Sequence, residues 1–303
     1  MTNSGAIKGI VPILITPFDE SGAIDSESLR NLVEFNIENG VHGLGVANGS
    51  ELFKLSEAER DLVVRCVIDA VAGRVPVVIS TGAAGTQLAI QYSRQAQEAG
   101  ADAIMLMPPS FMPIAFEAAV NYYREVARSV GIPVVLQDVP MAPVSPTLAL
   151  QIAAECKNIR YIKVETYPLT AKVEAMAKAA GDVLTIFGGA GGTYFIEEMR
   201  RGAVGTMPYC SQPADFVAVW DKFQAGDEAG AREVFDRRIM AINRLIAQGH
   251  DTQHHLHKQL LVRLGVIRTA TVRGATVAPD PVTQGEIDEL LKQLVPQAQP
   301  FSA

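Results

Sequence analysis

A lysine and a glutamate stand two residues apart inside an apolar stretch of this sequence, NIRYIKVETYP at residues 158–168. Its isoleucines, valine and tyrosine are typical of a buried strand, whereas lysine is among the residues least often fully buried. Because side chains alternate across a strand, Lys163 and Glu165 share one face with Tyr161. An amine and a carboxylate on one face form either a structural ion pair or a catalytic pair.

The catalytic interpretation of this pair is covalent chemistry on a carbonyl compound. A lysine that loses its hydration holds more neutral amine, and a neutral amine attacks a ketone to form a Schiff base. The protonated imine makes the adjacent C–H acidic, so a second group must move protons. Glu165 lies about 6.6 to 7 Å along the strand from Lys163, within reach of a substrate bound there. The spacing alone leaves the Schiff base and the structural ion pair equally open.

The elements that must position this pair are eight short apolar stretches, each followed by a segment of helical periodicity. Continuous apolar strands are typical of a parallel sheet that is covered on its outer face. Eight such units predict a (β/α)8 TIM barrel, with a doubly wound sheet as the alternative. No GxGxxG follows the first strand, which disfavours a dinucleotide site. At the C-terminal mouth of a barrel, where active sites of this fold lie, the strand would present Lys163 and Glu165.

The expected elements follow from apolar periodicity and from capping residues. Ser26 is expected to cap one helix, and Ser56 with Glu59 predicts a capping box at another. The expected strands are 9–18, 41–47, 75–81, 101–109, 132–140, 158–168, 183–189 and 202–208. The expected helices are 26–40, 56–73, 86–100, 116–129, 147–156, 170–180, 193–201 and 214–224. We therefore predict a barrel domain over residues 1–225 and a helical C-terminal extension over residues 226–303.

The composition of the chain disfavours some classes of binding partner. The chain has 303 residues, 48% of them hydrophobic, and a formal net charge of −7, which disfavours a nucleic-acid binder. No apolar run is long enough to span a membrane, and the N-terminus lacks the features of a signal peptide. Three widely spaced cysteines, Cys66, Cys156 and Cys210, favour a reducing cytoplasm. We predict a cytoplasmic protein without a membrane or nucleic-acid partner.

No metal site is predicted. The cysteine spacing excludes a CxxC-type zinc site, and the cluster HHLH, with His254, His255 and His257, is the other candidate. On a helix His254 shares a face with Lys258 and not with the other two histidines. A solvated or interface helix therefore accounts for this cluster better than a zinc site does.

Several motifs together resemble those of the dihydrodipicolinate synthase / N-acetylneuraminate lyase family. They are ITPFDESGAID (15–25) after the first strand, Lys163 at the end of the sixth, and GAVGTMP (202–208) at the eighth. The resemblance covers the whole chain and implies a class I, Schiff-base-forming lyase on a (β/α)8 barrel. It implies that Lys163 is the Schiff-base lysine, that the substrate is a small 2-keto acid, and that the protein is a homotetramer.

The chain departs from the family pattern at three places. The family usually has GTTGE after the second strand, where this chain has ANGSE; Asn48, Gly49 and Ser50 would then hold the substrate carboxylate. The family usually ends its fifth strand in YNVP, and this chain has QDVP, with Gln137 in place of the proton-shuttling tyrosine. The paired tyrosines after the fourth strand are replaced by Ser110 and Phe111. An amide exchanges no protons as a phenol does, so another acid/base is required.

These departures resemble one branch of the family, the L-2-keto-3-deoxyarabonate dehydratases. That branch has a similar loop, a similar fifth strand, and a K-x-E on the sixth whose glutamate is the acid/base. The resemblance implies a 2-keto-3-deoxy sugar acid as substrate, Glu165 as acid/base, and no metal or organic cofactor. A pyruvate-dependent aldolase or synthase is the alternative enzyme, and a catalytically idle keto-acid-binding paralogue is the alternative outside enzymes.

One further stretch is a candidate for contact with the substrate. FGGAGG (187–192) follows the seventh strand and is rich in glycine, but it lacks the lysine pattern of a P-loop. Its glycines permit either a close approach of substrate to the backbone at Gly188 or Gly189, or a plain turn. We count Gly188 and Gln137 among the predicted substrate-binding residues.

Overall fold

The structure, a computed structural model, describes residues 6–110, 112, 114–249 and 251–301. The strands are β1 (Gly9–Ile10), β2 (Leu44–Val46), β3 (Val77–Ser80), β4 (Ala103–Leu106), β5 (Val134–Asp138), β6 (Ile159–Val164), β7 (Thr185–Gly188) and β8 (Gly205–Thr206). The α-helices are α1 (Ser26–Glu38), α2 (Glu57–Val71), α3 (Thr86–Ala99), α4 (Phe116–Arg128), α5 (Pro146–Glu155), α6 (Leu169–Ala180), α7 (Phe195–Met199), α8 (Pro213–Gln224), α9 (Glu228–Val234), α10 (Met240–Ile246), α11 (Thr252–Arg263) and α12 (Pro281–Leu294). The short helical turns are η1 (Asn48–Ser50), η2 (Leu52–Lys54), η3 (Ala190–Gly192) and η4 (Phe235–Ile239).

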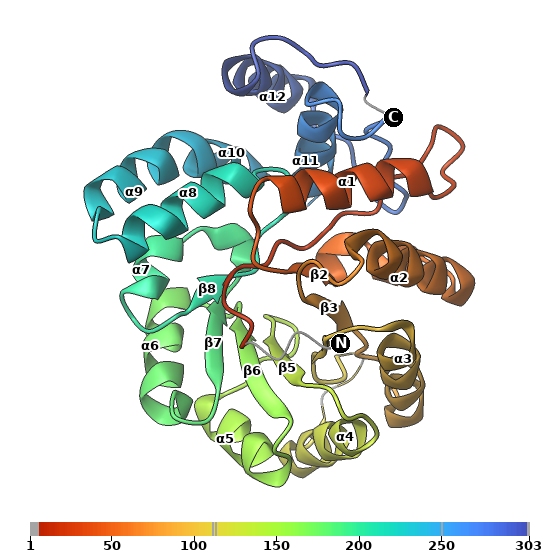
Figure 1. Cartoon of the computed structure of the whole chain (residues 1–303), viewed down its shortest axis with the longest axis vertical. Helices are drawn as coiled ribbons and strands as arrows, with labels where there is room; N and C mark the ends of the chain where they lie inside the picture. Colours follow the sequence, from red (N-terminus) through yellow and green to blue (C-terminus); the bar gives the residue numbers. More distant parts are fainter. Residues whose placement is uncertain (1–5, 111, 113, 250, 302–303) are drawn as a thin grey trace. The chain divides into compact units, whose positions relative to one another are not determined.

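The strands form one parallel sheet in the order β1-β8-β7-β6-β5-β4-β3-β2. Between the two ends of this order the backbone N–H of His42 donates to the carbonyl of Ile10 at 2.8 Å, which closes the sheet. Helices α3 to α7 lie on the outer side of the strands that they connect (Figure 1). The fold is the predicted (β/α)8 TIM barrel with additional C-terminal helices.

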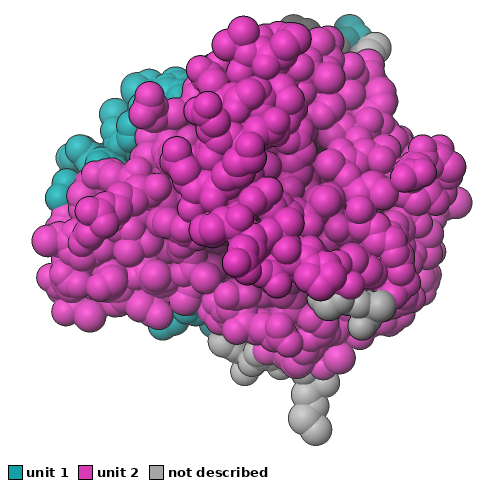
Figure 2. All heavy atoms as spheres, turned by 90° about the horizontal axis from the view of Figure 1, so that it is seen from above, with its two compact units in different colours: residues 1–11, 42–47, 75–208 teal, residues 12–41, 48–74, 209–303 magenta. Residues whose placement is uncertain are grey.

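The chain divides into two compact units, coloured separately in Figure 2. Unit 1 consists of residues 1–11, 42–47 and 75–208 and contains every strand of the sheet. Unit 2 consists of residues 12–41, 48–74 and 209–303. Both units are assembled from separate stretches of the sequence. The boundary after residue 225, between a barrel domain and a helical C-terminal extension, stays a prediction.

Capping residues fix where two helices begin. The predicted capping box of α2 is present, because Ser56 and Glu59 each bond the other's backbone N–H. The predicted cap of α1 is wrong by one residue. Asp25 is the N-cap, and its carboxylate accepts from the backbone N–H groups of Glu27 and Ser28, so Ser26 is the first helical residue. A carboxylate at this position also suits the positive end of the helix dipole.

The first strand is much shorter than predicted. Apolar residues run from 9 to 18, but only Gly9 and Ile10 form the strand β1. Pro12 and Pro17 lie within the predicted stretch. Proline has no N–H to donate to a ladder, so apolar character alone could not extend the strand.

The C-terminal helices of unit 2 have their own core. Ile242 of α10, Leu256 and Leu260 of α11, and Ile287 and Leu291 of α12 are buried in one cluster. Burial of a Leu or Ile side chain contributes about 1.5–3 kcal/mol, so this cluster holds the three helices together. In the described part of the chain no helix is both long and apolar enough to cross a membrane.

Candidate active site

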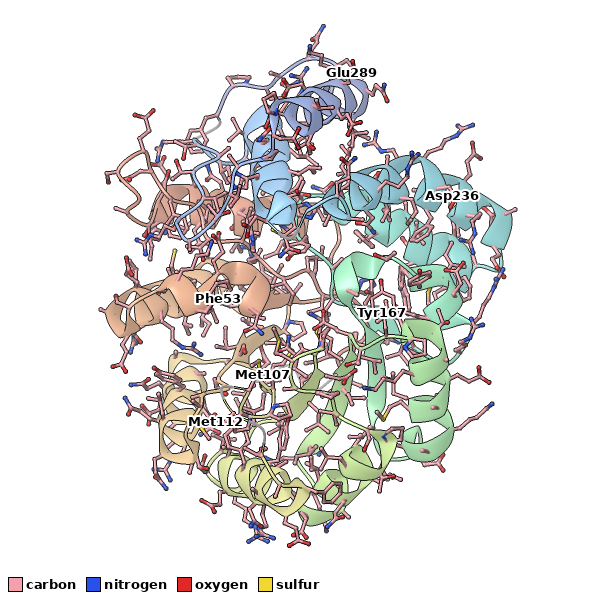
Figure 3. All side chains as sticks on the ribbon, turned by 180° about the vertical axis from the view of Figure 1, so that it is seen from behind. Phe53, Met107, Met112, Tyr167, Asp236 and Glu289 are labelled. Atoms are coloured by element: carbon pink, nitrogen blue, oxygen red, sulfur yellow. The ribbon has the colours of Figure 1, made fainter. Side chains whose placement is uncertain are left out.

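Lys163 and Glu165 form a close pair at the carboxyl end of β6. Lys163 lies on the strand and is only 5% exposed, and Glu165 follows the last strand residue. The Lys163 Nζ atom lies 3.0 Å from Glu165 Oε1. Met107 and Tyr167, labelled in Figure 3, lie just beyond the ends of β4 and β6 and so mark the same end of the sheet. The pair therefore lies at the end where barrel enzymes carry their chemistry.

Two further donors hold the carboxylate of Glu165. The side chain of Gln137 donates from Nε2 to Glu165 Oε2 at 3.1 Å. The backbone N–H of Ala190 donates to Oε1 at 3.0 Å. Ala190 has a φ of +48°, a left-handed conformation that is uncommon outside glycine. With Lys163, three donors contact this carboxylate and fix its orientation.

Gln137 reaches the pair from the neighbouring strand. It opposes Lys163 in the β5–β6 register and is 2% exposed. Its Nε2 donates to Glu165, while its Oε1 has no hydrogen-bond partner among the described residues. The structure thus brings together three of the predicted site residues: Lys163, Glu165 and Gln137. Phe111, predicted to replace a family tyrosine, lies outside the described residues.

Asp138 organises the backbone around this pair, although we predicted no role for it. It is completely buried and accepts from the backbone N–H groups of Val144, Glu165 and Thr166 at 2.8, 3.2 and 3.1 Å. Its carboxylate also accepts from Thr166 Oγ1 and Lys172 Nζ, both at 2.6 Å. The segment that follows Lys163 is therefore fixed to β5. The aspartate of QDVP was visible in the sequence, but its donors come from distant segments.

The two glycines at the end of β7 are needed for the close approach of carboxyl groups. A Cβ atom on Gly188 would lie 1.8 Å from Glu198 Oε2, and one on Gly189 would lie 2.4 Å from Glu165 Cγ. No real side chain tolerates such contacts. The space that a Cβ atom of residue 188 would need is therefore taken by Glu198. The predicted contact of Gly188 with substrate stays a prediction.

Glu198 is a second residue that the sequence analysis missed. It lies on α7, is completely buried, and neither carboxyl oxygen has a hydrogen-bond partner among the described residues. Burial, together with the charges of Glu165 and Glu197, raises the pKa of the Glu198 carboxyl to about 8. At neutral pH this side chain is therefore a neutral acid. A glutamate in the apolar stretch YFIEEM is the only sequence signal for it.

The loop Asn48–Ser50 belongs to unit 2 and forms the turn η1. Ser50 is 1% exposed, and its hydroxyl donates to the carbonyl of Leu14. The Ser50 carbonyl in turn accepts from Thr16 Oγ1 at 2.6 Å. Because the one hydroxyl proton of Ser50 is already donated, this side chain offers a substrate only acceptor capacity.

The residue that follows this loop is tied to the C-terminal helices. Glu51 and Lys258 of α11 form an ion pair at 2.7 Å in which both side chains are completely buried. Lys54 lies 3.1 Å from the other oxygen of Glu51. Burial lowers the pKa of Lys258 to about 8, against the opposing charge of Glu51, and Lys258 Nζ also donates to the carbonyl of Thr271 at 2.9 Å. The helices of the C-terminal extension therefore help to stabilise this loop.

The three histidines of HHLH bond to three separate partners. His254 Nε2 contacts the Gly49 carbonyl, His255 Nε2 the Thr276 hydroxyl, and His257 Nδ1 the Ser211 hydroxyl. Burial lowers the pKa of His257 to about 3, so this ring is neutral. Within the described residues no group of histidine, cysteine and acidic side chains has the arrangement of a metal site.

Comparison with known proteins places this geometry in a family. The sequence profile of the "Dihydrodipicolinate synthetase family" matches residues 6–294. A 4-hydroxy-tetrahydrodipicolinate synthase from Sorangium cellulosum is 32% identical over 295 residues, which cover 95% of this chain and 96% of the relative. An L-2-keto-3-deoxyarabonate dehydratase from Azospirillum brasilense is 27% identical over 296 residues, covering 95% of each chain.

Comparison with solved structures leads to the same family. YagE from E. coli K12, a prophage protein in complex with pyruvate, has a TM-score of 0.88 at 26% identity, and the match covers 96% of this chain and 99% of YagE. A dihydrodipicolinate synthase from Rhodopseudomonas palustris has a TM-score of 0.86 at 27% identity, with 95% and 97% covered. A lysine amine is one of the side chains that can form a Schiff base with a carbonyl substrate, and a buried lysine lies on β6. This chain belongs to the dihydrodipicolinate synthetase family and is a Schiff-base-forming lyase.

Proposed function

We propose that this protein is a dehydratase of a 2-keto-3-deoxy sugar acid resembling L-2-keto-3-deoxyarabonate. The observation that carries the proposal is the Lys163–Glu165 contact of 3.0 Å, with Gln137 bonded to the same carboxylate. An amide at position 137 cannot exchange protons, so the group best placed for acid/base work is Glu165. The dehydratase relative from Azospirillum brasilense supports the choice of reaction.

The reaction follows from the imine. Lys163 attacks the C2 ketone, and water leaves to form a protonated Schiff base. Glu165 takes a proton from C3 to give the enamine, then returns a proton to the C4 hydroxyl as the C4–O bond breaks and water departs. Proton shifts and hydrolysis release Lys163 and a semialdehyde keto acid such as 2-oxoglutarate semialdehyde. The imine itself is the electron sink, so these steps require no metal or organic cofactor.

The remaining roles are proposed from the family resemblance. Asn48, Gly49 and Ser50 would receive the substrate carboxylate, with the backbone as the main donor, since the Ser50 hydroxyl already donates to Leu14. Gly188 would lie along the bound substrate through its backbone. A homotetramer in the cytoplasm is proposed on the same basis, and the three cysteines, all free thiols, are consistent with a reducing compartment.

A pyruvate-dependent aldolase or synthase is the second candidate. The observations that favour it are the synthase relative at 32% identity and the resemblance to YagE, which was solved with pyruvate. The two candidates differ in the bond that breaks. Dehydration breaks C4–O and keeps the carbon skeleton, whereas aldol cleavage breaks C3–C4 and releases pyruvate.

A panel of C5 and C6 2-keto-3-deoxy acids separates these candidates. Each acid is incubated with enzyme, and the products are scored by mass for loss of water and by lactate dehydrogenase for pyruvate. We expect loss of water without pyruvate, abolished by Lys163→Ala and unaffected by Lys178→Ala, a substitution of an exposed lysine on α6. Stoichiometric pyruvate release would instead establish the aldolase, and no reaction with any acid would favour an idle paralogue that only binds keto acids.

A further inference from the structure

Two carboxyl groups flank the adjacent glycines at the end of β7. The Glu165 side chain lies against Gly189, and the Glu198 carboxyl lies against Gly188. A Cβ atom on either glycine would overlap the neighbouring glutamate, at 2.8 Å from Glu165 Oε1 and 1.8 Å from Glu198 Oε2. The two acids are therefore packed against the backbone of adjacent residues, in space that a larger side chain at either position would occupy.

The surroundings of the two acids are unequal. Glu165 accepts hydrogen bonds from Gln137 and Ala190 and contacts the ammonium group of Lys163. Glu198 is completely buried and has no hydrogen-bond partner for either oxygen among the described residues. Donors stabilise a carboxylate, and burial without donors destabilises it. Of the two carboxyls, Glu198 is therefore the one whose surroundings favour the protonated form.

We propose that Glu198 is a positioning residue for Glu165: it stays protonated while the enzyme works, so that Glu165 can release a proton as well as take one. This inference rests on the proposed function, in which Glu165 takes a proton from C3 and gives one to the departing C4 hydroxyl. Two adjacent carboxylates resist a common charge, so an ionised Glu198 would make Glu165 release less readily a proton that it has already taken from C3. Removal of the C3 proton would then outpace its donation to the leaving hydroxyl.

Among the described residues, Glu165 at the end of β6 and Glu197 on α7 are the charged groups that raise the pKa of the Glu198 carboxyl. Helix α6, which packs beside α7, carries Glu174, and that residue pairs with Arg201 at 3.6 Å. The pKa of Glu198, raised to about 8, places its ionisation just above neutral pH.

The test compares two rates with L-2-keto-3-deoxyarabonate as the probe. One rate is oxidation of the enamine by hexacyanoferrate(III), which consumes the enamine after Glu165 has removed the C3 proton and needs no return of that proton. The other is loss of water, which also needs proton donation. Both are followed across pH in the unmodified enzyme, in Glu198→Gln, in Glu198→Leu, which replaces the acid with an apolar side chain, and in the exposed control Glu174→Gln.

In the unmodified enzyme and in the Glu174 control, we expect the ratio of enamine oxidation to water loss to rise by up to tenfold per pH unit above the titration of Glu198. In both Glu198 variants the ratio should stay flat with pH. The same rise in a folded Glu198 variant would overturn the inference and leave the proposed function intact. If the unmodified enzyme shows neither enamine oxidation nor water loss, the proposed function is wrong and the inference fails with it.

Discussion

Gln137 donates a hydrogen bond from Nε2 to Glu165 Oε2 at 3.1 Å, from the strand position that faces Lys163 in the sheet. The family usually has a proton-shuttling tyrosine where this chain has Gln137. The amide orients a carboxylate that lies 3.0 Å from the lysine amine. Proton transfer is thereby assigned, in our proposal, to Glu165 rather than to position 137.

Substitution Glu165→Gln should keep the fold and the imine but lose turnover. Removal of a general acid/base typically costs 10²–10⁴-fold in rate, so we expect kcat for water loss to fall by about that much. The measurement is kcat across pH, alongside borohydride trapping of the imine, with Glu174→Gln as the control. A kcat within about tenfold of normal at a displaced optimum would show that Glu165 only pairs with Lys163.

Restoring the family tyrosine gives a complementary check. In the Glu165→Gln background, Gln137→Tyr should recover part of the lost turnover, because a phenol at this position can exchange protons. Recovery is measured as kcat relative to the single variant. No recovery in a folded double variant would count against a simple exchange of the acid/base role between these two positions.

Substitution Asp138→Asn should destabilise the protein and loosen the active-site segment. The amide has one acceptor oxygen in place of two, and it leaves the ammonium group of Lys172 without its buried partner. Breaking a buried pair costs about 3–5 kcal/mol, measured as the free energy of unfolding in denaturant. Asp138 also accepts a hydrogen bond from the backbone N–H of Glu165. The substitution should therefore lower kcat by a larger factor than the rate of imine formation. A loss below about 1 kcal/mol would contradict this account of Asp138.

The pH dependence of stability should carry the signature of Glu198. Its pKa is raised from 4.5 in the unfolded chain to about 8 in the folded protein, so the folded state binds more protons between these values. The contribution is fully present below about pH 4.5 and is lost as pH rises to about 8. At about 1.4 kcal/mol per unit of pKa difference, the change amounts to a few kcal/mol. Glu198→Gln should flatten the dependence of the unfolding free energy on pH between these two values. An unchanged dependence in the folded variant would contradict this account of Glu198.

The buried pair Glu51–Lys258 should behave as a coupled unit. Lys258→Met removes one of the two lysine partners of the buried Glu51 carboxylate and leaves Lys54, and we expect a loss of about 3–5 kcal/mol in unfolding free energy. The double variant Glu51→Gln, Lys258→Met removes both charges and should recover most of that loss. A double variant as unstable as the single one would show that the ion pair is not the source of the effect.

The barrel could be predicted from the sequence because its determinants are local. Apolar stretches and helical periodicity recur along the chain, and they located the eight strands and the helices between them. The extent of β1 could not be predicted from apolar character, because Pro12 interrupts the ladder. The cap of α1 is Asp25 and not the predicted Ser26, because both residue types are good caps and only the hydrogen bonds distinguish them.

The site was predictable in part for a related reason. Lys163 lies on β6 and Glu165 directly follows its last residue, so the strand period of two predicted that their side chains share a face. Asp138 and Glu198 act through donors, burial and glycine backbones from other elements, and no spacing in the sequence encodes those contacts. The division of the chain into units likewise depends on long-range packing.

The most direct test of the central claim is to locate the Schiff base. The enzyme is incubated with pyruvate and reduced with borohydride, and the intact mass and the modified peptide are determined for the unmodified protein, Lys163→Ala and the exposed control Lys178→Ala. We predict one pyruvyl adduct per chain on Lys163, retained in the Lys178 variant and lost in Lys163→Ala. An adduct that persists in Lys163→Ala, or that lies on another lysine, would contradict the account.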